Sequence, residues 1–179
     1  MEQLLRDCRI TQIYEGTNGI QAMDLLARKL GMNQGKPVMD LLGEIQQTLA
    51  AAKAIPNLKD TAAKVEAAVN KLGEVMMHIG QAAMSIDTRM NAFAHAYPFM
   101  EVSGDVVMSW LLLWRATIAA EKLENGAKKK DAAFYEGQLK SAEFFVNCVL
   151  PVILGNMHKI FLITSTILYT AEDLVGGQC

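Results

Sequence analysis

The fold is decided by residues 58–93, LKDTAAKVEAAVNKLGEVMMHIGQAAMSIDTRMNAF. Apolar side chains recur there in alternating steps of four and three residues: Leu58, Ala62, Val65, Val69, Leu72, Met76, Ile79, Ala83, Ile86, Met90 and Phe93. This heptad-like spacing predicts one long, unbroken helix that packs against other helices at a shallow angle.

A second helix is predicted before this stretch, from Pro37 to about Ala54, because its apolar residues follow helical spacing and Pro56 cannot continue it. Two glycines between residues 31 and 35 indicate a junction, since glycine favours the end of a helix and proline favours the start of one. We expect a domain boundary there, which divides the chain into residues 1–34 and 35–179.

A third long helix is predicted to begin between Pro98 and Asp105 and to end near Asn125 and Gly126. Residues 106–114 are apolar almost all round, so this helix should be the most buried of the set.

A fourth helix should begin near Lys129, and Pro151 should kink it or end it nearby. Residues 160–175 continue apolar and favour helix. No stretch of the sequence shows a pattern that favours a β-strand over these helices. The chain is therefore predicted to be all-α, with an up-down bundle of long antiparallel helices over residues 37–155.

Composition narrows the class of protein. The chain has 179 residues, 51% hydrophobic and 20% charged, which is typical of a globular domain. Its net charge of −2, without a sustained basic face, argues against nucleic acid as a partner. The uncharged stretch 144–158 is short and contains Pro151 and Gly155, so we expect no membrane span.

Cysteines and histidines are sparse. Three cysteines (residues 8, 148 and 179) form no close pair, which favours free thiols and a reducing cytoplasm. Three histidines (His78, His95 and His158) show no metal-ligand spacing, and we expect no metal site.

The strongest functional signal is RITQIYEGTNGIQ, residues 9–21. Glu15 lies between a predicted helix end (residues 2–8) and a helix that starts after Thr17 or Asn18, with Gln21 at capping-box spacing from Asn18. That second helix should place Ile20, Met23, Leu26, Ala27 and Leu30 on one face. Apolar neighbours would raise the pKa of a carboxyl and make it a usable base, although most loop glutamates are simply solvated.

This run closely resembles the C-terminal active-site signature of the acyl-CoA dehydrogenases, flavoenzymes that oxidise acyl-CoA thioesters. The match runs through Arg9, Ile10, Ile13, Tyr14, Glu15, Gly16, Thr17, Ile20 and Gln21. Together with residues 24–30, it is most similar to a subgroup with an extra C-terminal helical extension, which includes 3-methylmercaptopropionyl-CoA dehydrogenase-like enzymes.

The resemblance implies a mechanism. Glu15 corresponds to the catalytic base that removes the α-proton of the acyl thioester, while a hydride leaves the β-carbon for flavin N5 and gives a trans-2-enoyl-CoA. Glu15 and Gly16 correspond to substrate-binding positions, and Thr17, Asn18 and Gly19 to positions that contact FAD. Many relatives carry other residues in place of Asn18 and Gly19, so we expect these two residues to contact FAD through their backbone.

The resemblance also implies partners. Electrons would pass to electron-transferring flavoprotein, and relatives are commonly homo-oligomers. Because the family builds its FAD and acyl-CoA pockets mostly from upstream segments, we expect the chain to be the C-terminal part of a longer enzyme and inactive alone. The alternative is a stand-alone helical interaction or scaffolding module without catalysis. A DNA-repair-associated relative is disfavoured by the lack of a basic face.

Overall fold

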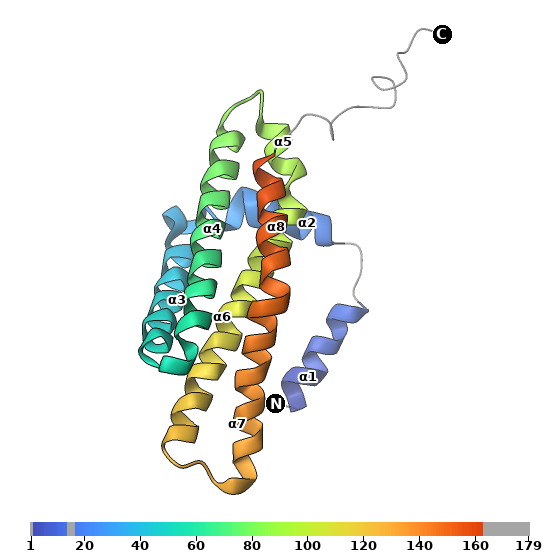
Figure 1. The fold of residues 1–179 in the computed structure, drawn as a ribbon. Coiled ribbons are helices and arrows are strands. Elements are labelled where there is room, and N and C mark those ends of the chain that lie inside the picture. Colours follow the sequence, from blue (N-terminus) through green and yellow to red (C-terminus); the bar gives the residue numbers. More distant parts are fainter. Residues whose placement is uncertain (1, 14–16, 163–179) are drawn as a thin grey trace, which may run out of the picture.

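The computed structural model describes residues 2–13 and 17–162, and these residues form helices and the turns between them, without a strand (Figure 1). The α-helices are α1 (Glu2–Cys8), α2 (Asn18–Asp24), α3 (Lys36–Ala54), α4 (Lys59–Met84), α5 (Arg89–Ala94), α6 (Ala96–Glu124), α7 (Lys129–Phe144) and α8 (Leu150–Phe161). The all-α prediction is confirmed.

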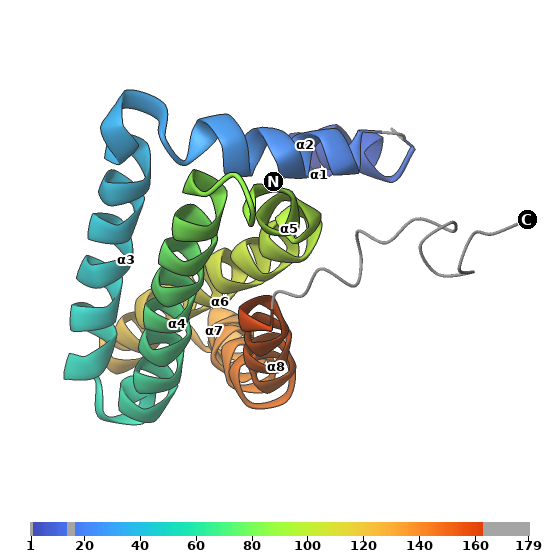
Figure 2. The same cartoon turned by 90° about the horizontal axis from the view of Figure 1, so that it is seen from above.

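Four long segments form the bundle: α3, α4, α6 and the continuous run of α7 and α8 (Figures 1 and 2). Successive segments run in opposite directions, as the up-down prediction requires. Helices α4 and α6 form the middle pair, with α3 packed on one side and α7–α8 on the other. Helix α2 crosses the bundle and packs on α6.

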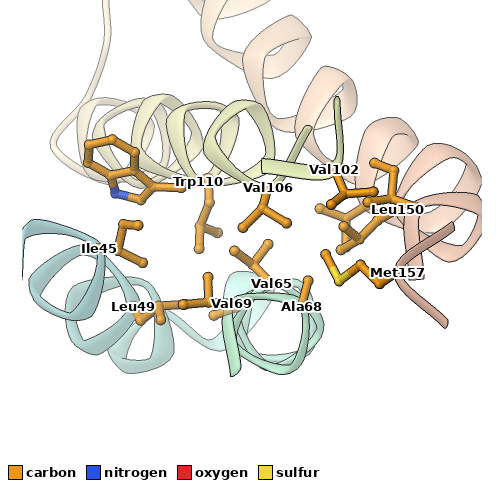
Figure 3. Close-up of a cluster of buried hydrophobic side chains, with 14 of the residues drawn as sticks. Ile45, Leu49, Val65, Ala68, Val69, Val102, Val106, Trp110, Leu150 and Met157 are labelled. Carbon is orange, nitrogen blue, oxygen red and sulfur yellow. The ribbon is translucent and has the colours of Figure 1, made fainter. Parts of the chain in front are cut away.

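Helix α6 supplies the centre of the core (Figure 3). Its Val106 and Trp110 face α3 and α4, and its Val102 lies beside Leu150 of α8. It buries more side chains than any other described helix, which confirms the expectation from its apolar sequence. Burial of this kind is the main favourable term in folding, at about 25 cal/mol per Å² of apolar surface.

The first helix of the bundle begins where the sequence predicts. Residues Asn33, Gln34 and Gly35 have left-handed backbone angles (φ 49°, 59° and 81°), so the chain turns sharply there. Pro37 then lies in the first turn of α3, where its missing N–H costs nothing, and the helix ends at Ala54 before Pro56.

The predicted unbroken helix over residues 58–93 is wrong in its last quarter. Helix α4 ends at Met84, and Ser85 is extended (φ −87°, ψ 138°). The Thr88 hydroxyl donates to the Ala82 carbonyl at 2.7 Å, and Arg89 Nε donates to the Ala83 carbonyl at 3.2 Å. These side chains satisfy carbonyls that a helix end leaves free, so the chain can turn into α5.

Both later prolines lie within helices. Helix α6 begins at Ala96, earlier than predicted, because Pro98 falls in the first turn, where its N–H is not needed. Pro151 does not end its helix. A π-helical turn over Phe145–Val149 precedes it, and the extra residue in that turn absorbs the clash that proline causes in a regular helix.

The helix Lys129–Phe161 is therefore continuous over 33 residues and is long and apolar enough, by length and composition, to cross a membrane. The sequence argument that Pro151 interrupts it is wrong. Core helices of soluble proteins pass the same test, and this helix packs its buried residues against α4 and α6. Length and apolar composition alone do not establish that this helix spans a membrane. The apolar sequence predicted as helix beyond Leu162 lies outside the described residues.

A hydrogen bond between buried side chains joins α3 to α6. Trp110 Nε1 donates to the Thr48 hydroxyl at 2.9 Å, and that hydroxyl donates to the Glu44 carbonyl at 3.1 Å. Trp110 is 8% exposed and Thr48 is 9% exposed, so this hydrogen bond is largely shielded from water. The Thr117 hydroxyl is also buried but donates to the Leu113 carbonyl of its own helix at 2.9 Å.

Thr48→Val should lower the free energy of unfolding by about 1–3 kcal/mol, because it leaves the buried Trp110 N–H without an acceptor. Thr117→Val is the matched control, since its loss leaves no donor unpaired, and should cost well under 1 kcal/mol. Urea denaturation of both variants measures the difference. Equal losses would contradict the role assigned to the Thr48–Trp110 bond.

Three polar side chains in α4, α5 and the residue after α5 have a buried atom without a partner. His78 Nε2, Asn91 Oδ1 and His95 Nδ1 are buried and have no hydrogen-bond partner among the described residues. The pKa of His95 is lowered by burial and, secondarily, by the charge of His78. The His78 ring also lies 5.1 Å from the ring of Phe161, so the end of α8 packs on this cluster. Sequence spacing gave no sign that the two histidines are neighbours.

The lowered pKa of His95 makes stability depend on pH. Below about pH 6.5 the unfolded chain binds a proton that the folded chain resists, so the free energy of unfolding should fall as pH drops from about 7 to 5. His95→Gln should flatten this dependence, and His158→Gln, which removes an exposed histidine, is the control. Denaturation curves at each pH test it, and an unchanged slope in His95→Gln would refute it.

Candidate active site

The motif segment lies between α1 and α2. Tyr14, Glu15 and Gly16 fall outside the described residues, so the roles assigned to Glu15 and Gly16 stay predictions. The described elements around Glu15 are as expected: α1 covers Glu2–Cys8, a 3₁₀ turn covers Arg9–Gln12, and α2 starts at Asn18, within the motif.

The predicted cofactor-binding residues form the start of α2. Thr17 is the N-cap residue (φ −120°, ψ 2°), and Asn18 is the first residue of the helix. Because Thr17, and not Asn18, is the N-cap, Gln21 lies four residues after the cap instead of three. The predicted capping box between Asn18 and Gln21 is therefore wrong. The Gln21 backbone N–H donates to the Thr17 carbonyl at 2.8 Å, which closes the first helical turn. The Thr17 hydroxyl makes no capping hydrogen bond.

This segment offers polar groups that a bound cofactor could use. Thr17 is half-buried with a hydroxyl not used for capping, and the backbone amides of the first helical turn have no partner within the helix. Gly19 is exposed, and a Cβ there would meet nothing within 4 Å. Hydroxyl and amide groups of this kind are the partners that the polar atoms of a flavin would need, and the assignment of Thr17, Asn18 and Gly19 to the cofactor stays a prediction.

The apolar residues beside the motif are exposed. Ile13 is 75% exposed and Ile20 is 68% exposed, while α1 has no buried residue at all. Within residues 2–13 and 17–162, these apolar side chains do not enclose a pocket beside the motif. A carboxyl is desolvated only when apolar groups surround it, so the expectation of a desolvated Glu15 stays a prediction.

Helix α2 attaches to the bundle by a face that differs from the predicted one. Ala22 is fully buried, and Leu25, Leu26 and Leu30 pack against the core. Ile20, Met23 and Ala27, which were predicted on the same face as Leu26 and Leu30, are exposed. A π-helical turn over Leu25–Lys29, closed by the Leu30 N–H on the Leu25 carbonyl at 3.1 Å, changes the register between the two halves.

An ion pair supports this part of the helix. Arg28 Nε lies 2.6 Å from Asp24 Oδ1, and Lys29 Nζ lies 3.6 Å from Asp24 Oδ2. The hydrogen bond from Arg28 lowers the pKa of the Asp24 carboxyl, so the pair is charged at neutral pH.

Two other arrangements bear on ligand binding. Within residues 2–13 and 17–162, no three His, Cys, Asp or Glu side chains are placed to hold a metal ion. An apolar cavity, half open to the surface, lies between the turn that follows α2, α3, α4 and α6, and no sequence pattern predicted it. Its lining comes from four separate segments, so no linear motif could have indicated it.

Comparison with known protein families gives a match over most of the chain. The sequence model of the family described as "Acetyl-CoA dehydrogenase C-terminal like" matches residues 41–168. The matched region covers α3 from its second turn to the described end of α8.

Curated proteins are similar over nearly the whole chain. The broad-specificity linear acyl-CoA dehydrogenase FadE5 of Mycobacterium tuberculosis is 27% identical over 96% of this chain and 29% of its own length. A butyryl-CoA dehydrogenase of Syntrophomonas wolfei is 32% identical over 87% of this chain and 25% of its own. The 3-methylmercaptopropionyl-CoA dehydrogenase of Ruegeria pomeroyi is 32% identical over 83% and 24%. The chain spans about a quarter of the length of these relatives.

Proposed function

This chain belongs to the acyl-CoA dehydrogenase family, and from that premise we propose that it is the C-terminal part of an FAD-dependent acyl-CoA dehydrogenase. The complete enzyme would oxidise an acyl-CoA to a trans-2-enoyl-CoA. The observation that carries the proposal is the signature at residues 9–21, on a chain that is otherwise similar to the C-terminal part of this family.

Within this proposal Glu15 is the catalytic base. Its carboxylate removes the α-proton of the thioester, and Gly16 leaves room for the substrate to approach the backbone. FAD, when bound, supplies the acceptor for the hydride that leaves the β-carbon. Thr17, Asn18 and Gly19 would hold the cofactor through the free hydroxyl and the backbone amides at the start of α2.

The exposed apolar residues around the motif support an active site shared with another part of the enzyme. Ile10, Ile13 and Ile20 of the motif are each more than half exposed, which leaves apolar surface there for another segment to cover. Upstream segments of the same polypeptide would cover them and desolvate Glu15. The isolated 179-residue chain should accordingly show no dehydrogenase activity.

Several finer points belong to the same proposal. We place the boundary between catalytic domain and extension at residues 34 and 35, where the backbone is left-handed. Electron-transferring flavoprotein is the expected electron acceptor, and a homo-oligomer is the expected assembly. Cys8 and Cys148 are free and exposed, which is compatible with a reducing cytoplasm.

The test is Glu15→Gln in the enzyme that contains this chain together with its FAD-binding segments. Mixed anaerobically with butyryl-CoA or dodecanoyl-CoA, the unmodified enzyme should lose flavin absorbance. Glu15→Gln should retain FAD but react at least about 10²-fold more slowly, the usual cost of losing a general base.

Glu136→Gln, which neutralises an exposed glutamate on α7, should reduce its flavin at the unmodified rate. Equal rates for Glu15→Gln and the unmodified enzyme would assign the base to another residue. An enzyme that binds neither FAD nor acyl-CoA would favour a helical interaction module instead.

A further inference from the structure

One face of α6 is covered over only half its length. Its residues recur in alternating steps of four and three, so they lie in one stripe along the helix: Met100, Gly104, Val107, Leu111, Trp114 and Ile118. The first three line the apolar cavity together with Leu25 and Leu30, from the turn that follows α2. The last three line a surface groove whose other lining residues all belong to α6 as well. No other described element therefore lies across this half of the stripe.

The uncovered half is apolar and exposed. Trp114 and Ile118 are 46% and 45% exposed. The Trp110 ring lies 16° from parallel to the Trp114 ring, with centroids 5.8 Å apart, so the exposed area of Trp114 is on its other face and its edge. Phe134 of α7 lines a neighbouring hollow together with Ile118 and is 63% exposed. We call Leu111, Trp114, Ile118 and Phe134 the α6 patch.

We propose that the α6 patch is the surface on which the upstream catalytic segments of the complete enzyme pack. The inference rests on the proposed function, because it assumes that such segments exist. It names the place where they contact the bundle, which the motif does not indicate. An exposed apolar patch with a polar rim is typical of a surface that another folded segment covers.

The position of helix 18–30 favours this occupant. Its first residues belong to the motif, and its Leu25 and Leu30 cover the first half of the same stripe. Catalytic segments that reach the motif therefore approach the side of the bundle on which the α6 patch lies. The chain spans only about a quarter of the length of its curated relatives, so the complete enzyme has enough further polypeptide to cover both.

The rim of the α6 patch is charged. Glu44 and Glu121 line the groove on the α3 side of Trp114, and neither forms an ion pair among residues 2–13 and 17–162. Arg115, on the α7 side, donates a hydrogen bond to Gln138 instead. Complementary charges give an interface its orientation, so the upstream segments should place basic side chains opposite the two glutamates.

The first experiment measures whether the α6 patch is covered in the enzyme that contains this chain together with its upstream segments. Ile118→Cys introduces a thiol in the patch. Val152→Cys is the matched control, because Val152 of α8 is 62% exposed and lines none of these grooves. N-ethylmaleimide should label Ile118→Cys at least about tenfold more slowly than Val152→Cys, since the reagent must wait for the interface to open. In urea the two thiols should react at similar rates.

Equal labelling of the two thiols in the native enzyme would overturn the proposal. The flavin absorbance of the same samples reports the proposed function separately. An enzyme that holds FAD and oxidises acyl-CoA but labels both positions equally would keep the proposed function and lose the α6 patch as a docking surface. An enzyme that binds neither FAD nor acyl-CoA would lose both.

The second experiment identifies the segment that covers the patch. The photoreactive residue p-benzoylphenylalanine replaces Phe134, an aromatic side chain of similar shape, and the crosslinked peptide is identified by mass spectrometry. A crosslink within one polypeptide to a segment before residue 1 of this chain supports the proposal. A product of twice the mass, which indicates a second copy, would overturn it. So would a crosslink to residues 163–179 or the absence of any crosslink.

Discussion

The structure depends on the need to cover α6 on nearly every side. Its sequence is apolar around most of the helix, so no single partner can bury it. Helices α3 and α4 cover one side, α7 and α8 another, and α2 crosses its first half. Where no helix covers it, Met108, Trp114 and Ile118 remain 45–47% exposed.

The spacing of apolar residues predicted the helices of the bundle well, but it did not predict where a helix is interrupted. The apolar seam that leads into and along α4 is buried at Leu58, Ala62, Val65, Val69 and Ile79 and half-buried at Leu72 and Met76, but Ile86 and Met90 are 84% and 64% exposed. The spacing counts apolar residues and ignores the Ser, Asp and Thr between them, which compete for backbone hydrogen bonds. The expectation that Pro151 ends its helix is also wrong. Whether proline ends a helix depends on how the backbone nearby can adjust, as the π-turn before Pro151 illustrates.

At the candidate site, too, some features could be predicted from the sequence and others could not. Its motif is continuous in sequence and could be found there, and the helix boundaries around it were predicted to within a residue or two. The environment of the motif could not be predicted, because burial is decided by segments far away in the chain. The face by which α2 attaches was also missed, since the π-turn over Leu25–Lys29 rotates the helix in a way that regular helical spacing does not anticipate.

The motif, the bundle and the cavity are connected through a few leucines. Ala22, Leu25, Leu26 and Leu30 fix helix 18–30 on the bundle, and the residues at the start of that helix belong to the motif. Leu25 and Leu30 also line the cavity. The bundle is thus in direct contact with the helix whose first residues belong to the motif.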